Sequence, residues 1–374
     1  MRIWRYAGIF LLIQLILFLA HWFVYHTWVA FWPHLCRAAR LGLGAAMLVL
    51  AFTFVPASLL SFRFCNSAVA SFYKFAAVWL GFLNYFFLAA CLSWPAWYLV
   101  RAFASWAGAD AARPRIAGVF FALAAVTGLY GLLNAYWIRV RRIAVNLRNL
   151  PESWRGRKAI VLSDLHLGQV NGFRFCRRLT VLAARFNPDL VFLPGDLFDG
   201  VKAGFDRLIA PFRNLAPPFG IYFSTGNHEG FGDTKAMIEA IRRAGIRVLA
   251  NECITVDGLQ IAGIPDKDSG DPVRMQTSLD ELRLDRAQTS ILLHHAPVRL
   301  RMVEAACVSL QISGHTHGGQ FFPFTWITRR VFGSFTYGMN EFGALKVCTS
   351  SGAGTWGPPM RVGSQPEVVL ITFQ

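Results

Sequence analysis

Acidic residues are almost missing from the first part of this chain of 374 residues. Between residues 1 and 140 the sequence holds one acidic side chain, Asp110, whereas Asp and Glu become common from Arg141 onward. A soluble domain of ordinary composition carries charged residues of both signs along its whole length. The first third of the chain therefore cannot be a soluble domain, and the chain has two parts of different character.

The chain also lacks a disulfide framework. Its 7 cysteines are odd in number and widely spaced, and no two of them form a Cys-x-x-Cys pair. Disulfide-stabilised domains are short and carry an even number of cysteines. The cysteine pattern therefore favours a reducing compartment.

No nucleic-acid-binding motif accompanies the positive charge of the chain. The 37 Lys and Arg residues exceed the 21 Asp and Glu residues, which gives a formal net charge of +16. Such an excess attracts either nucleic acid or the anionic surface of a membrane. Because the sequence holds no helix-turn-helix, zinc-finger or RNA-binding motif, it indicates a lipid bilayer as partner and no nucleic acid.

Four apolar stretches in the first part are each long enough to cross a bilayer, which takes about 20 helical residues. A cleaved signal peptide would be single and shorter. Aromatic rings that settle at the membrane surface collect near the ends of the stretches, as Trp4, Tyr6, Trp28, Trp32, Trp94, Trp97, Tyr136 and Trp137. The sequence therefore predicts an all-α transmembrane bundle in residues 1–138, with spans near 7–31, 41–62, 75–100 and 116–138.

The basic residues beside these spans predict the orientation of the chain. Loops that carry more Lys and Arg stay in the cytoplasm. One side of the membrane would hold Arg2, Arg5, Arg63, Lys74, Arg139, Arg141, Arg142 and Arg148, and the other would hold Arg37, Arg40, Arg101, Arg113 and Arg115. The larger set has eight residues against five and includes the residues before the first span and after the last span, so both termini are expected in the cytoplasm.

Ionisable side chains are scarce within the spans. Transporters place such groups along their substrate pathway. The predicted spans offer only His21 and His26 near one interface and the polar Gln14 inside. The bundle is therefore interpreted as an anchor, with a sensor or transporter bundle as the alternative.

Residues 139–374 have the pattern of an α/β domain. Apolar runs of strand length lie near 143–147, 159–162, 190–193, 221–223, 291–293 and 310–312. Helical patterns at 173–186, which is amphipathic and basic, and at 234–244, after the N-cap Asp233, lie between some of them. This alternation favours a sheet whose strands are buried on both faces.

Polar motifs follow five of these strands. In order they are Ser-Asp-Leu-His at 163–166, Gly-Asp at 195–196, Gly-Asn-His-Glu at 226–229, His-His-Ala-Pro at 294–297 and Gly-His-Thr-His-Gly-Gly-Gln at 314–320. Ligands bind beyond the carboxyl ends of strands in α/β sheets, so these segments can converge on one crevice. Carboxylate, amide and imidazole groups together suit hard and borderline divalent ions. The set therefore predicts a metal site.

At these motifs the sequence resembles the calcineurin-like metallophosphoesterases, over residues 143–373. It is similar to the bacterial membrane-anchored branch with the Gly-His-Thr-His-Gly-Gly-Gln motif and a closing segment like that at 351–361. That branch includes a UDP-diacylglucosamine pyrophosphate hydrolase of lipid A synthesis. Animal transmembrane proteins with a metallophosphoesterase domain share the layout of spans followed by this domain. The resemblance implies a four-layer αββα sandwich in residues 139–374 and a bacterial inner-membrane location.

The resemblance also implies that two divalent ions bind here and that residues of the five motifs are their ligands. The ligand set accepts Mn, Fe, Zn or Mg. Asp196 would bridge both ions. One ion would be held by Asp164, His166 and His317, and the other by Asn227, His295 and His315.

Two further histidines receive different roles. His228 would stabilise charge on the phosphoryl group or protonate the leaving oxygen. His295 is preferred to His294 as a ligand because the family motif runs His-x-Pro, which residues 295–297 match. His294 is then expected to be an ordinary strand residue.

The expected reaction is hydrolysis of a phosphodiester or pyrophosphate bond. Two ions about 3.5–4 Å apart lower the pKa of a bridging water and supply a hydroxide that attacks phosphorus. The aromatic and basic segment at 321–332 follows the last metal motif directly and could enter a membrane interface or line an acyl-chain groove. With the membrane bundle, this segment favours a lipid-linked substrate resembling UDP-diacylglucosamine, contacted by Arg361, Phe321 and Trp326.

Three alternatives stay open. A tethered phosphodiesterase or phosphatase could act on a soluble substrate such as a cyclic nucleotide. A phosphoprotein is a second possible substrate. As a third alternative, the hydrolase could be the accessory of a sensor or transporter bundle. Separately from these functions, segment 321–332 could be an ordinary core segment of the fold.

Overall fold

The structure, a computed structural model, describes residues 2–374, apart from the side chains of residues 2–7 and 107. The side chains predicted to anchor the start of the chain, Arg2, Trp4, Arg5 and Tyr6, lie outside the described ones. The chain forms two compact units, residues 1–133 with 357–360 and residues 134–356 with 361–374. This division falls inside the last apolar helix, a few residues before the predicted domain boundary at 138/139, which stays a prediction.

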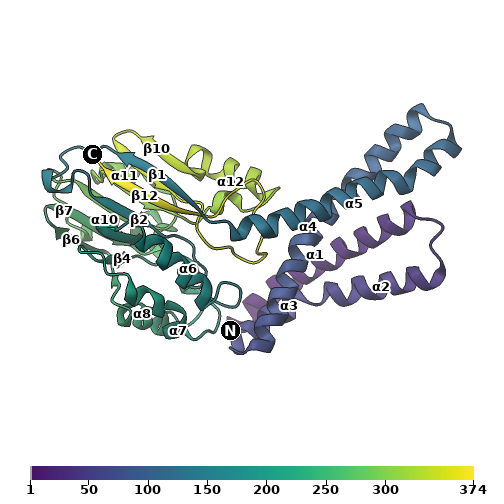
Figure 1. The fold of residues 1–374 in the computed structure, drawn as a ribbon, viewed down its shortest axis with the longest axis horizontal. Coiled ribbons are helices and arrows are strands. Elements are labelled where there is room, and N and C mark those ends of the chain that lie inside the picture. The colour runs from purple at the N-terminus through teal and green to yellow at the C-terminus, as the bar shows by residue number, and fades with distance from the viewer. Residues whose placement is uncertain (1) are drawn as a thin grey trace. The chain divides into compact units, whose positions relative to one another are not determined.

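The first unit is made of helices (Figure 1). They are α1 (Arg2–Phe31), α2 (Arg37–Ala51), α3 (Phe54–Arg63), α4 (Ser67–Phe103) and α5 (Trp106–Tyr136). Four segments of the described chain are long and apolar enough to cross a membrane, namely Gly8–Phe31, Arg37–Arg63, Ser67–Phe103 and Gly108–Tyr136. The prediction of four long apolar helices is confirmed.

The second apolar segment is interrupted between α2 and α3. Pro56 is the third residue of α3 and has no N–H to donate to the carbonyl of Phe52, so the helix breaks at that turn. The hydroxyl of Thr53 donates instead to the carbonyl of Leu50 at 2.7 Å. Pro95 does not end its helix, since α4 continues through it to Phe103.

Several polar side chains inside the helical unit have hydrogen-bond partners within it. The indole N–H of Trp79 donates to Nε2 of His21 at 2.8 Å, and Nδ1 of His21 lies 2.7 Å from the carbonyl of Leu17. The indole of Trp94 donates to the hydroxyl of Thr27 at 2.9 Å. A buried polar group that already has a partner needs no ligand. These hydrogen bonds agree with the interpretation of the helical unit as a membrane anchor.

Two mixed sheets of six strands form the second unit. The first has the order β1 (Arg139–Val145), β12 (Glu367–Phe373), β2 (Lys158–Val161), β3 (Leu190–Leu193), β4 (Ile221–Phe223) and β5 (Arg247–Val248). The second has the order β10 (Gly338–Phe342), β11 (Leu345–Thr349), β9 (Leu310–Ser313), β8 (Ser290–His294), β7 (Leu259–Ile264) and β6 (Glu252–Val256).

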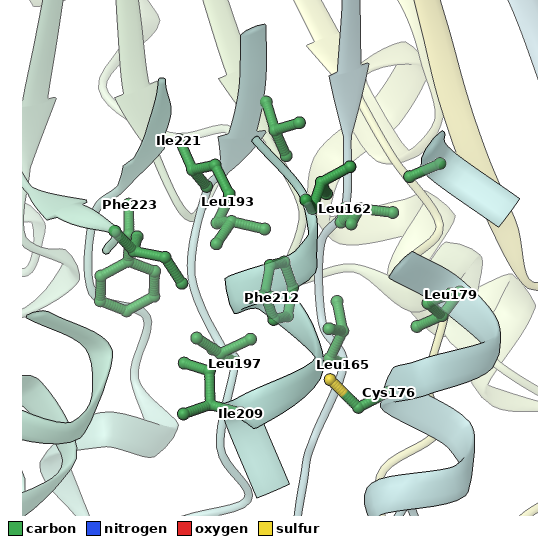
Figure 2. Close-up of a cluster of buried hydrophobic side chains, with 14 of the residues drawn as sticks. Leu162, Leu165, Cys176, Leu179, Leu193, Leu197, Ile209, Phe212, Ile221 and Phe223 are labelled. Atoms are coloured by element: carbon green, nitrogen blue, oxygen red, sulfur yellow. The ribbon is translucent and has the colours of Figure 1, made fainter. Parts of the chain in front are cut away.

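The alternation of side chains along each strand builds the layers. Ala159 and Val161 of β2 pack in one apolar cluster with Ile291 of β8, so this cluster lies between the two sheets. Ile160 and Leu162 point to the opposite face and join a second cluster. Helices α6 (Phe173–Ala184), α7 (Phe205–Ile209) and α8 (Thr234–Arg243) cover that second cluster, part of which Figure 2 shows.

Helices also cover the outer face of the second sheet. Ala262 of β7 and Leu292 of β8 pack there with residues of α10 (Pro272–Glu281) and α11 (Leu300–Ala305). Two short or exposed helices, α9 (Asp266–Ser269) and α12 (Phe324–Phe332), complete the unit. The prediction of an αββα sandwich is confirmed.

The first strand begins earlier than the sequence predicts. The pattern predicts a strand at 143–147 and a last span that reaches residue 138, but α5 ends at Tyr136 and β1 starts at Arg139. Parallel pairing with β12 begins at Arg139 and Glu367, and Arg141 forms an ion pair with Glu367 at 3.1 Å. This pairing holds the basic residues before Ile143 in an extended conformation, which local periodicity does not reveal.

Candidate metal centre

The carboxyl ends of neighbouring parallel strands bring the polar motifs together. β2, β3 and β4 are consecutive parallel strands of one sheet, and β8 and β9 are parallel neighbours in the other. The segment after each of these strands carries one or two of the predicted ligands. Because the sheets pack face to face, both sets of strand ends meet at one edge of the sandwich.

Asp164, His166 and His317 form the first group of potential ligands. One ligand atom from each lies within 4.8 Å of the others. The Nε2 atoms of His166 and His317 are 3.0 Å apart, and Nε2 of His317 is 3.6 Å from Oδ1 of Asp164. Nδ1 of His166 lies 3.2 Å from a carboxylate oxygen of Asp199, which orients the ring.

Asp164, Asp196 and His295 form a second group. Nδ1 of His295 donates to the carbonyl of Pro194 at 2.9 Å, so Nε2 carries the lone pair in the neutral ring; without an ion, and against the effect of burial, the charge of Asp196 raises the pKa of His295 to about 10. That Nε2 is buried without a hydrogen-bond partner among the described residues, 3.1 Å from Oδ2 of Asp196. A buried lone pair that faces a carboxylate is costly unless a cation lies between them, so these residues fit a metal ion.

Asn227 and His315 stand at the more open side of the site. Oδ1 of Asn227 is 2.9 Å from Nδ1 of His315, and both residues are half-buried while the other candidate ligands are buried. The rings of His295 and His315 meet edge to face with their centroids 5.1 Å apart. The structure therefore places all seven predicted ligands at this edge, with His315 outside the three groups of potential ligands that the described residues form, and their assignment to individual ions stays a prediction.

The backbone at the site adopts a conformation that side chains normally avoid. Left-handed φ angles between 47° and 68° occur at five of the seven candidate ligands, namely Asp164, His166, Asp196, His315 and His317. Such angles cost energy and persist where the surrounding structure enforces them, often at functional sites. A Cβ atom at Gly226 or Gly314 would collide with Asp196 or Asp164, so these motif positions need glycine.

Glu229 holds the loops around Asp196 in place. Its carboxylate accepts the backbone N–H groups of Gly226 at 2.8 Å, Phe198 at 3.0 Å and Asp196 at 3.1 Å. Burial, together with the negative charge of Asp196, raises the pKa of Glu229 to about 7. The side chain thus connects the segments after β3 and β4.

His228 contacts two of the candidate ligands, Asp196 and His166. Its backbone N–H donates to Oδ1 of Asp196 at 2.9 Å, and its ring packs edge to face on His166 at 4.6 Å. It also belongs to a third group of potential ligands with His166 and Asp196. Burial and the nearby His166 lower its pKa, so the ring is neutral near pH 7.

Comparison with known proteins agrees with this geometry. The family described as calcineurin-like phosphoesterase matches residues 157–319. An uncharacterized metallophosphoesterase of Aquifex aeolicus (strain VF5) is 33% identical over 258 residues, which cover 67% of this chain and 98% of the relative. This chain belongs to the calcineurin-like metallophosphoesterase family. It is accordingly a metal-dependent phosphoesterase.

Two other similar proteins add context. A transmembrane protein with metallophosphoesterase domain from Danio rerio is 31% identical over 268 residues, which cover 67% of this chain and 61% of that protein. A dimetal phosphatase structure from Danio rerio shares 10% identity with a TM-score of 0.36, over 59% of this chain and 100% of that one. The first supports membrane association. The score of the second is too low to bear on function.

Arg361 of this metallophosphoesterase is fully buried behind His317. Its guanidinium donates to the carbonyl of His317 at 2.7 Å and to the carbonyl of Gly352 at 3.3 Å, and Nη2 lies 3.2 Å from Nδ1 of His317. Burial lowers the pKa of Arg361 to about 10, so it keeps its charge. The guanidinium is engaged with the protein, which favours a positioning role; the predicted contact with substrate stays a prediction.

The aromatic segment after the last metal motif forms an exposed helix. None of the side chains of α12 is buried, and Trp326 and Val331 are 60% and 68% exposed. Phe321, just before the helix, is buried instead. Phe332, at its end, packs edge to face on His315 at 5.9 Å, so α12 begins and ends beside the site. Segment 321–332 is thus not a core segment.

His294 lies outside the groups of potential ligands, as a buried residue at the end of β8. Nδ1 of His294 accepts a hydrogen bond from Gln311 at 3.5 Å. Burial, with His295 next to it, lowers the pKa of His294 to about 3. It is therefore neutral in the folded chain.

Two neighbours of the site carry no distinct signal in the sequence. The hydroxyl of Ser163 donates to Asp164, and the ring of Trp356 packs on His228 with centroids 5.7 Å apart. Ser163 could be inferred only from its place beside Asp164. Trp356 could be inferred only from the resemblance of segment 351–361 to related proteins.

Proposed function

We propose that this chain is a membrane-anchored phosphohydrolase that cleaves a phosphodiester or pyrophosphate bond of a lipid-linked substrate. The proposal depends above all on one observation, the exposed apolar helix α12 beside the candidate metal centre. Membership of the metallophosphoesterase family supports the bond type, and the four apolar helices support the membrane anchor. The lipid part of the substrate, resembling UDP-diacylglucosamine, is inferred from α12.

Helix α12 offers an apolar surface for a lipid chain beside the site that would bind the reacting phosphate. Large apolar side chains that stay exposed together mark a binding or membrane surface. Phe324, Ile327 and Val331 are such side chains, spaced three and four residues apart on one face of the helix, and Arg329 and Arg330 follow in the last turn. An acyl chain would contact the apolar face while the arginines attract the phosphate.

The candidate ligands would hold two divalent ions, with Asp196 shared between them. When bound, the ions would polarise the phosphoryl oxygens and lower the pKa of water at the site. Asp199 and Arg361 would orient His166 and His317 from behind, and Glu229 would fix the loops around Asp196. Nδ1 of His228 donates to the carbonyl of Asp199 at 3.2 Å, so Nε2 would donate a hydrogen bond or a proton to the leaving oxygen only after His228 has taken up a proton and become an imidazolium.

We place the catalytic unit on the cytoplasmic face of a bacterial inner membrane. The excess of basic residues before the first span and after the last span supports this side.

A tethered enzyme with a soluble substrate is the second candidate. The half-buried Asn227 and His315 leave the site open to small phosphodiesters, which would need no apolar helix. In that case α12 would serve only to attach the domain to the bilayer. The two candidates differ in how substitutions on α12 affect turnover.

Matched substitutions on two helices separate these candidates. Val331 of α12 and Val273 of α10 are exposed valines, 68% and 74% accessible. Full-length Val331→Asp should lose most of its kcat/KM on a lipid pyrophosphate yet keep hydrolysis of a soluble aryl phosphodiester, whereas Val273→Asp should keep both. Equal loss on the two substrates, or a wild-type preference for the soluble diester, would contradict the lipid-linked substrate.

A further inference from the structure

A basic groove lies next to the end of the last membrane helix, and none of the candidate ligands lines it. Its volume is about 810 Å³. One wall is the outer face of α6, with Arg174, Arg177, Arg178 and the C-cap residue Arg185. The other wall is formed by Tyr136 and Trp137, where α5 ends. None of these residues has a role in the proposed reaction.

The arginines share one face of α6 because of their spacing. Residues three and four apart lie above one another on a helix, as Arg174, Arg177 and Arg178 do. The opposite face, with Cys176 and Leu179, is buried in the core of the sandwich. The arginine face is therefore held outward by packing and is exposed.

Chain continuity places the aromatic wall of the groove at the membrane surface. Tyr136 is the last residue of the apolar segment Gly108–Tyr136, and Trp137 follows it. Both side chains are 69% exposed, as expected for rings that lie among lipid headgroups. The guanidinium of Arg178 lies 6.0 Å from the ring centroid of Tyr136, so the two walls of the groove meet at these two residues.

The positive charge of the groove is not neutralised by the protein. Among the described residues, Arg174, Arg177, Arg178 and Arg185 form no ion pair with an acidic side chain, and α6 itself contains no Asp or Glu. Basic residues close to a membrane attract anionic lipids strongly. Val181 and Leu182 add an apolar surface between the arginines.

We infer that this groove binds the headgroup of an anionic phospholipid of the surrounding bilayer. The phosphodiester of the lipid would pair with the arginines, and the start of its acyl chains would pack on Val181 and Leu182. Charge complementarity and the position at the end of a span favour a membrane lipid over a soluble anion. The inference goes beyond the proposed reaction, because it concerns a lipid that is bound and not cleaved.

Lipid binding to the full-length protein in detergent tests the inference by native mass spectrometry. The wild type should bind phosphatidylglycerol at least about tenfold more tightly than phosphatidylcholine. A variant with Arg→Gln at residues 174, 177, 178 and 185 should lose that preference. A control with Arg→Gln at the exposed residues 213, 242, 286 and 301, which removes the same net charge, should keep it.

Three results would overturn the inference. The groove variant could retain the preference, or groove and control variants could lose it alike, which would indicate only a net-charge effect. Inorganic phosphate at millimolar concentration could displace the bound phosphatidylglycerol, which would indicate a site for a soluble anion. The fourfold groove variant should hydrolyse a soluble aryl phosphodiester at the wild-type rate. If that variant does not fold, the double variant Arg177→Gln, Arg178→Gln replaces it.

Discussion

The Nε2 atoms of His166 and His317 face each other at 3.0 Å, although 151 positions separate the two residues in the chain. Nδ1 of His166 is directed at Asp199, and Nδ1 of His317 is directed at Arg361, so both rings are oriented from behind. Because the guanidinium of Arg361 can only donate, Nδ1 of His317 accepts, and a proton on Nε2 of His317 can bridge to Nε2 of His166; a divalent ion held by these two atoms would displace that proton. Asp164 completes the group from a third side.

Removal of divalent ions should therefore destabilise the catalytic unit. An ion that binds only the folded chain stabilises it by about 2.7 kcal/mol when its concentration is 100 times its Kd. Treatment with a chelator should lower the Tm of the full-length protein in detergent, and added Mn²⁺ should restore it. A Tm that chelator and Mn²⁺ leave unchanged would contradict a metal site at these residues.

Asp196→Asn should abolish hydrolysis while the protein stays folded. Asp196 faces His295 at 3.1 Å and belongs to two of the ligand groups, so loss of its charge weakens metal binding on both sides. The expected loss exceeds the roughly 10–100-fold effect of a residue that only orients a ligand. Turnover of an aryl phosphodiester near the wild-type rate would exclude Asp196 as a shared ligand.

His294 and His295 should respond in opposite ways to the same substitution. His295→Leu should lower turnover by at least about 100-fold, because Nε2 of His295 faces Asp196. His294→Leu should keep turnover and change stability by about 1 kcal/mol or less, since a neutral buried side chain is replaced by an apolar one. If His294→Leu is the inactive variant, the His-x-Pro assignment is wrong.

Arg361→Lys should separate a positioning role from contact with substrate. Lys keeps the charge but lacks the planar fork that joins His317 to Gly352. A positioning role predicts roughly 10–100-fold weaker Mn²⁺ affinity, measured by titration of the metal-free protein. Unchanged Mn²⁺ affinity together with a raised KM would favour the predicted contact with substrate.

Local patterns predicted the strands that carry the metal motifs. The strands at 190–193 and 221–223 were predicted with the bounds that β3 and β4 have, and α8 begins after the predicted N-cap, Asp233, which accepts the N–H of Ala236 at 3.1 Å. Short, apolar and β-branched runs between polar turns explain this success. β12, which lies between β1 and β2, could not be placed because its pairing joins the two ends of the domain.

The ligand residues could be predicted because their motifs are local, but the contacts of the residues that support them could not. Glu229 acts through backbone N–H groups of two segments, and Arg361 reaches His317 from 44 positions away. Such contacts depend on how the two sheets pack, which one sequence does not encode in any short pattern. The basic face of α6 was visible as an amphipathic pattern, whereas the groove beside it depends on the end of α5.

The metal content of the full-length protein, measured together with its turnover, tests the central claim most directly. Metal-free protein should be inactive, and titration with Mn²⁺ should restore hydrolysis of an aryl phosphodiester as the content approaches two ions per chain. Asp196→Asn should bind fewer ions under the same conditions. Full turnover by the metal-free protein, or maximal turnover with a single ion per chain, would contradict a two-metal phosphohydrolase.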